Sequence, residues 1–174
     1  MRILMLVLAA ALAPADEPAY TVTIELGNVC GRDCIAILEK ALSKVDGVRE
    51  AKNYGDKFHF LLTIREDKSV LPASILQVVD KIRTESKGEE DFPLESFEIN
   101  SISGTAEKQG DAVLFVARGS KQKYALKPSA ELRKLLESGK MQLTIAGAVT
   151  EEKEKDGKKP LPLIEVGDAK ETPK

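Results

Sequence analysis

Two cysteines are the residues of this sequence whose type and spacing could do chemistry. Cys30 and Cys34 are the only cysteines among 174 residues, and they lie in the segment GNVCGRDC, residues 27–34. Two thiolates close together select a soft ion such as Cu(I) over hard cations. The same spacing also allows a disulfide, because Cα atoms four positions apart on a helix are about 6 Å apart. The residues alone therefore leave a metal site and a disulfide open.

Other side chains add little chemistry. His59 is the only histidine, and between Phe58 and Phe60 it reads as an ordinary exposed histidine on a strand. Met141 opens a predicted strand and is expected in the core, so a four-ligand zinc site is not predicted. One histidine leaves little room for nucleophilic catalysis, and the sequence contains no phosphate-binding or hydrolase motif. We therefore expect no enzyme.

A basic cluster lies in the second half of the chain. Arg118, Lys121 and Lys123 surround the Gly119 turn and could bind an anion. Tyr124 is the only aromatic residue nearby, whereas single-stranded nucleic acid is bound through several stacking side chains. The net charge of −2 also argues against binding nucleic acid by bulk charge. We expect an exposed hairpin and no nucleic-acid partner.

The elements that position the cysteines follow from hydrophobic periodicity. Alternating apolar residues over 20–26 predict a strand, and the apolar residues after Cys34 recur at helical spacing. Further patterns predict a hairpin over 48–53 and 58–64, a helix over 71–82 and a strand over 96–102. This βαββαβ order predicts an α+β fold that begins with a ferredoxin-like sandwich.

The second half has a different order. We predict strands over 103–108, 112–117 and 121–126, a helix over 129–138, and strands over 141–150 and 161–168. Three strands, a helix and two strands are the order of a small OB-like β-barrel. Residues 16–100 carry 17 acidic and 11 basic side chains, whereas residues 101–174 carry 11 and 14. The sequence therefore predicts two domains, residues 16–102 and 103–174.

The segment around the cysteines resembles the heavy-metal-associated domain of copper chaperones and metal-transporting ATPases. That family has G-M-x-C-x-x-C between its first strand and helix, followed by an apolar helix residue and L-x-x-l-x-G-V. This chain has Leu38 four residues after Cys34, and LSKVDGV over residues 42–48. It departs from the family in having three residues between the cysteines, and Asn28 where the family has Met. The resemblance covers residues 20–102 and implies that Cys30 and Cys34 hold Cu(I) or a similar soft ion.

The N-terminus predicts export. In residues 1–15, Arg2 is the only charged residue, an apolar run covers residues 3–13, and Ala13-Pro14-Ala15 follows. This pattern is typical of a secretory signal peptide cleaved after Ala15. The apolar run is too short to span a bilayer, so we predict no membrane span. The expected location is extracytoplasmic, periplasmic or secreted.

Two functions follow from these observations. The first is an exported protein that holds Cu(I) or a similar ion between Cys30 and Cys34, with a possible protein partner. The alternative is a non-enzymatic interaction module whose cysteines are disulfide-bonded or idle, since an oxidising compartment favours the disulfide.

Overall fold

A computed structural model gives the arrangement of three helices and eight strands among the residues it describes, which are 19–27, 32–55, 58–85, 92–136, 139, 141–151 and 160–172. In chain order these elements are β1 (Ala19–Leu26), α1 (Arg32–Leu42), β2 (Val48–Tyr54), β3 (His59–Arg65), α2 (Pro72–Glu85), β4 (Leu94–Gln109), β5 (Ala112–Ala117), β6 (Lys123–Lys127), α3 (Ala130–Leu135), β7 (Met141–Thr150) and β8 (Leu163–Glu171).

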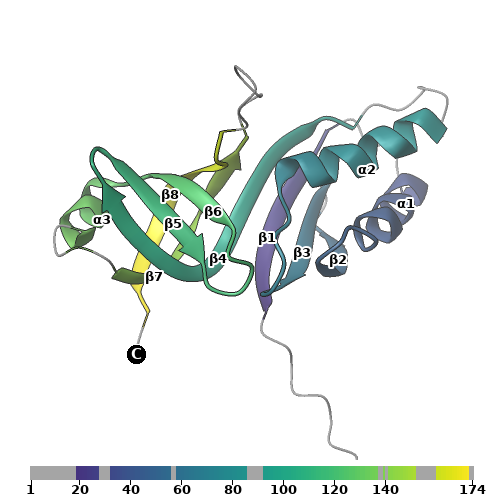
Figure 1. The fold of residues 1–174 in the computed structure, drawn as a ribbon. Coiled ribbons are helices and arrows are strands. Elements are labelled where there is room, and N and C mark those ends of the chain that lie inside the picture. Colours follow the sequence, from purple (N-terminus) through teal and green to yellow (C-terminus); the bar gives the residue numbers. More distant parts are fainter. Residues whose placement is uncertain are drawn as a thin grey trace, which may run out of the picture.

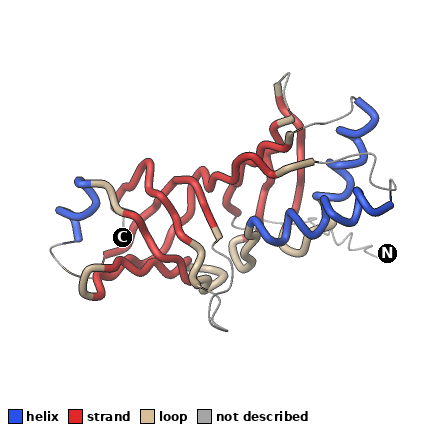
Figure 2. Tube along the Cα trace, turned by 90° about the horizontal axis from the view of Figure 1, so that it is seen from above, coloured by secondary structure: helices blue, strands red, loops and turns tan. Residues whose placement is uncertain are grey.

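The first part of the chain forms an antiparallel sheet with two helices on one face. The strands lie in the order β2-β3-β1-β4, and α1 and α2 lie together at one end of the molecule (Figures 1 and 2). Tyr20, Val22, Ile24 and Leu26 of β1 are buried, while the residues between them are half-buried. This period-2 alternation, which the sequence predicted for residues 20–26, buries one face of the strand.

The second part is a closed barrel. Strands β4, β5, β6, β8 and β7 follow one another around it, and the pairing of β4 with β7 closes it. All neighbouring strands are antiparallel except β6 and β8. Helix α3 follows β6, and its Ser129 N-cap hydroxyl accepts a hydrogen bond from the Leu132 N–H at 3.3 Å. The barrel fits an OB-fold only loosely.

Strand β4 belongs to both parts. It is 16 residues long, pairs with β1 through Leu94–Ser101, and pairs with β5 through Gly104–Gln109. Its pairing with β7 shifts register between Ile99 and Ile102, so the burial alternation changes phase there. The bulge lets one strand leave an open sheet and enter a barrel. The predicted boundary between Ile102 and Ser103 therefore lies inside a strand.

The predicted fold class, a ferredoxin-like sandwich followed by a separate barrel, is wrong. Among the described residues 53% are in strands and 23% in helices, and a closed five-stranded barrel is the dominant feature. The predicted strands over 96–102 and 103–108 are one strand, β4, within one eight-stranded sheet. The bulge explains the error, because it interrupts the apolar alternation at Asn100 and Ser101 without ending the strand.

Candidate functional site

Cys34 lies in the first turn of α1 and points into the core. It is 4% exposed, and Leu38 and Leu42, one and two turns further on, are fully buried. These three residues are the apolar stripe that the sequence predicted. Asp33 in the first turn and Lys40 in the last complement the helix dipole. The start of the helix is thus fixed both by packing and by charge.

The sulfur of Cys34 is in a disulfide bond. The chain has one other cysteine, Cys30, so Cys30 is the only partner that the chain itself offers. Cys30, with residues 28–31, lies outside the described residues, and so does the predicted signal peptide. A disulfide sulfur is not a thiolate ligand, so the pair does not fit a soft metal ion in this state.

His59 lies on the opposite face of the sheet from Cys34. Phe60, Leu62 and Ile64 of β3 are fully buried under the helices, and His59 alternates with them. Its Nε2 atom is 3.1 Å from Glu25 Oε1, and its ring stacks on Tyr54 with the centroids 5.6 Å apart. The sheet therefore separates His59 from the cysteine.

Met141 also lies away from the cysteine. It is the first residue of β7 and packs half-buried against the core, opposite Ala106 in the barrel. Within the part of the chain that the structure describes, no group of three His, Cys, Asp or Glu side chains is placed to hold a metal ion.

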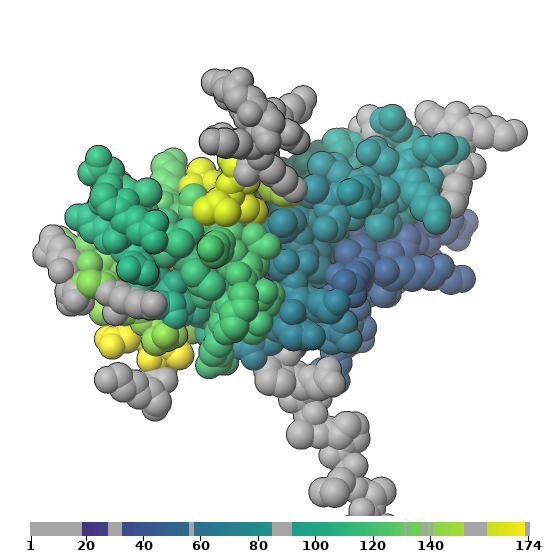
Figure 3. Space-filling model, viewed as in Figure 1, coloured from purple at the N-terminus to yellow at the C-terminus, as the bar shows by residue number. Residues whose placement is uncertain are grey.

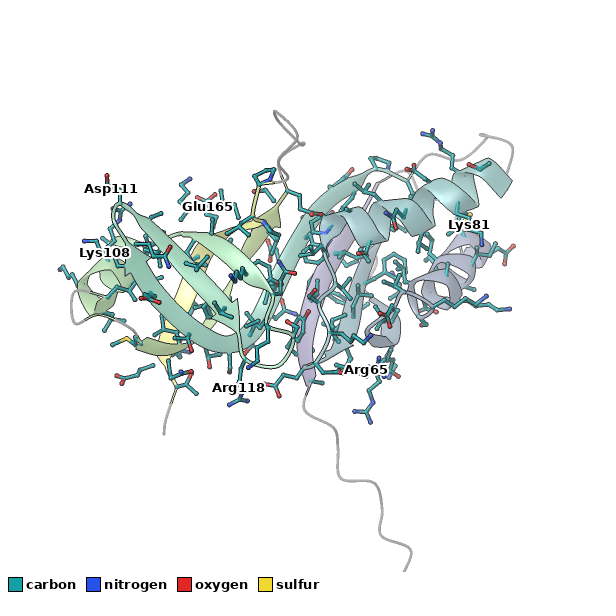
Figure 4. The ribbon with its side chains drawn as sticks, in the orientation of Figure 1. Arg65, Lys81, Lys108, Asp111, Arg118 and Glu165 are labelled. Carbon is teal, nitrogen blue, oxygen red and sulfur yellow. The ribbon has the colours of Figure 1, made fainter. Side chains whose placement is uncertain are left out.

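The predicted basic cluster is a contact between the barrel and the first sheet. The Arg118 side chain lies at the lower edge of the barrel in Figure 4, and its Nη2 and Nε atoms are 2.8 and 2.9 Å from Glu66 Oε1. Lys121 Nζ donates to the Arg118 carbonyl oxygen at 2.6 Å. Two of the three cations thus hold the β5–β6 turn in place. Of the three cations, Arg118 is the one whose charge is paired with a carboxylate among the described residues.

Gly119 makes the same contact possible. A Cβ atom at this position would lie 2.1 Å from the Glu66 carbonyl oxygen, so only glycine lets the β5–β6 turn approach the β3–α2 loop. Figure 3 shows the barrel and the helix-bearing part meeting over a continuous surface on this side. Sequence reasoning identified Gly119 as a turn residue and missed the contact, because the Glu66 backbone is 53 positions away.

A buried polar cluster forms a second contact between the parts. Glu151 Oε2 accepts a hydrogen bond from the Ala73 N–H, in the first turn of α2, at 2.6 Å. Tyr20 Oη accepts one from the Val70 N–H at 3.3 Å. Tyr124 Oη is buried with no hydrogen-bond partner among the described residues. Burial, with smaller contributions from Tyr20 and Glu151, raises the pKa of Tyr124 above its usual range.

A hollow of about 440 Å³ lies on the surface where β4, β7 and β8 run side by side. It is lined by Glu98, Ile99, Asn100, Ala146, Gly147, Ala148, Glu165, Gly167 and Asp168. Glu165 is on the upper side of the barrel in Figure 4. Sequence reasoning missed the hollow. Its one local signal is a pair of glycines, Gly147 and Gly167, inside strands, which often mark a bulge.

In comparisons with known proteins, no family model matches the chain, and no curated protein matches it significantly.

No helix in the described parts of the chain has the length and apolar character needed to cross a membrane.

Proposed function

We propose that this chain is a non-enzymatic interaction protein of an oxidising, extracytoplasmic compartment, in which the cysteine pair is a structural disulfide. The observation that carries the proposal is the disulfide-bonded state of Cys34. Disulfides persist in secreted and periplasmic proteins and are rare where thiols are kept reduced. The signal-peptide pattern of residues 1–15 supports the same location.

A structural role agrees with the surroundings of Cys34. The side chain is almost fully buried in the stripe of α1 that packs on the sheet. Buried cysteines in apolar surroundings are chemically inert, whereas catalytic and redox-sensing cysteines are partly exposed. Closing the short loop from Cys30 to Cys34 contributes about 2 kcal/mol by restricting the unfolded chain. The disulfide therefore anchors the start of α1.

Cu(I) binding by the reduced pair is the second candidate. The position of Cys34 in the first turn of α1 favours it, because a helix N-terminus stabilises a thiolate. This function requires reduction of the disulfide and turning of the Cys34 sulfur out of the core. It also requires the pair to accept an ion across three intervening residues instead of the family's two.

A Cu(I) titration of the reduced protein against a competing chelator separates the two functions. Our proposal predicts that the reduced protein competes no better than the Cys34→Ser variant. A variant lacking one of residues 31–33 restores the family's spacing and serves as the positive comparison. His59→Ala is the control, since His59 lies on the other face of the sheet. Tight binding by the reduced wild type that Cys34→Ser abolishes would establish the metal function instead.

A further inference from the structure

Three register shifts lie at one level of the sheet, beside the hollow between β4, β7 and β8, and two of them come from the same irregular stretch of β4, residues 99–102. Register shifts occur between Thr21 and Val22 in the β1–β4 pair, between Ile99 and Ile102 in the β4–β7 pair, and between Ala146 and Gly147 in the β7–β8 pair. Bulges bend strands and re-aim side chains, and they are frequent beside binding sites. Here they open a space where the first sheet turns into the barrel.

The strand registers define the shape of this space. Ala148 of β7 pairs with Glu98 of β4 on one side and with Glu165 of β8 on the other, so the three residues form a row on one face. Strands two positions apart in a sheet are about 10 Å apart. Ala146 pairs with Asp168, and Asn100 lies beside it on the bulged part of β4. The small β7 residues thus form the floor of the hollow, and the polar side chains of β4 and β8 form its two walls.

The charged residues described in the lining of the hollow are all acidic. Three carboxylates line the hollow, from Glu98, Glu165 and Asp168, and none of the other described residues in its lining is basic. Glu165 is paired with Lys127 at 2.9 Å and Asp168 with Lys170 at 3.2 Å, both from outside the lining. All four of these side chains are more than 60% exposed, so the two pairs are weak and easily exchanged. Among the residues described, no ion pair engages Glu98.

We propose that this hollow is a docking site for an arginine side chain presented by an extended segment of a protein partner. The proposal rests on the proposed function, since it names the partner chemistry of an interaction protein. A guanidinium is planar and has five N–H donors, so it can bind carboxylates on both walls, while the Asn100 amide is already hydrogen-bonded to Thr21 and Thr23 of β1. Within the described residues no group of three His, Cys, Asp or Glu side chains is placed to hold a metal ion, so these carboxylates do not form a metal site there. The volume of about 440 Å³ accommodates a long side chain.

The test uses the full-length mature protein and a peptide probe. The probe is an N-acetylated, C-amidated Gly-Arg-Gly tripeptide, and its control replaces arginine by the neutral isostere citrulline. Binding is followed by NMR shifts of the backbone amides of ¹⁵N-labelled protein. We expect the arginine peptide to shift Asn100, Gly147 and Gly167, and the citrulline peptide to leave them in place. Equal shifts with both peptides, or no shift at these three amides, would overturn the proposal.

Two substitutions on the same strand locate the binding. Glu98→Gln is expected to weaken the binding of the arginine peptide about threefold to fivefold, which is the effect of losing one partly exposed charge pair. Glu107→Gln removes an exposed carboxylate of β4 outside the hollow and is expected to change nothing. Equal weakening by both would mean that the peptide follows general negative charge, against the proposal. The state of the cysteines does not enter this test, so its failure leaves the proposed disulfide role untouched.

Discussion

Substituting Gly119 by alanine tests whether the barrel and the first sheet are held as one unit. The added Cβ would lie 2.1 Å from the Glu66 carbonyl oxygen and 2.5 Å from its carbonyl carbon. Non-bonded carbon and oxygen atoms keep at least about 3.3 Å apart, so the β5–β6 turn must move away by about 1 Å. Backbone atoms of Glu66 cannot yield as the end of a flexible side chain would.

The displacement has a measurable cost. Overpacking of this kind destabilises a protein by about 1–3 kcal/mol. In a chain of this length 1 kcal/mol corresponds to about 2–4 °C, so a cost of about 2 kcal/mol, the middle of that range, lowers the melting temperature by about 4–8 °C. The same movement stretches the 2.8 Å contact from Arg118 to Glu66. Arg118→Met should therefore cost less in the Gly119→Ala background than in the wild type.

Thermal unfolding followed by circular dichroism measures both effects. Gly167→Ala is the matched control, because the nearest atom to its added Cβ is the Ala146 carbonyl oxygen at 3.9 Å, an ordinary contact. The control should melt within about 2 °C of the wild type, as surface substitutions do. The reasoning is refuted if Gly119→Ala melts with the control, or if Arg118→Met costs the same in both backgrounds.

Three further predictions concern single side chains. The hydrogen bond and charge of Lys68 lower the pKa of Asp46 from its usual 3.8, so Lys68→Ala should raise that pKa, as an NMR titration of the carboxyl would show. Because the folded pKa is the lower one, the contribution of Asp46 to stability is present at neutral pH and lost as the pH falls through that pKa. Tyr124→Phe removes a buried hydroxyl without a described partner and should not destabilise the protein in urea unfolding. Tyr20→Phe leaves the Val70 backbone N–H without its acceptor and should lower the free energy of unfolding by about 1–3 kcal/mol. Ser129→Ala removes the N-cap of α3 and should cost about 1 kcal/mol in the same assay.

Local elements could be predicted from the sequence because their signals are local. The alternation in β1 and the i, i+4 spacing of Cys34, Leu38 and Leu42 each fix a buried face within a few residues. The predicted range 141–150 coincides with β7. At α3 the predicted helix over 129–138 begins on the N-cap Ser129, and the observed helix is Ala130–Leu135 with Leu136 as its C-cap. Residues 137 and 138 of the predicted range lie outside the described residues.

The connection between the two parts could not be predicted in the same way. The change in net charge near residue 100 suggested a domain boundary, but charge describes the surface, and β4 continues through that point. The contacts of Gly119 and Arg118 with Glu66, and of Glu151 with Ala73, join residues 52 to 78 positions apart. No periodicity or spacing in one sequence encodes such pairs.

The candidate site was predicted in part. Cys34 is at the expected strand–helix junction, and the disulfide was one of the two states that its spacing allowed. Which state forms depends on the redox compartment and not on the spacing. The hollow was missed because its walls come from β4 and β8, which become neighbours of β7 only in the folded sheet.

The thiol state of the native protein tests the central claim most directly. The protein is taken from its own compartment, unfolded in the presence of an alkylating reagent without reductant, and weighed intact by mass spectrometry. Our account predicts no alkyl group on Cys30 or Cys34, and one on each when reductant is added first. Two alkyl groups without reductant, on protein that carries copper when isolated, would contradict a structural disulfide.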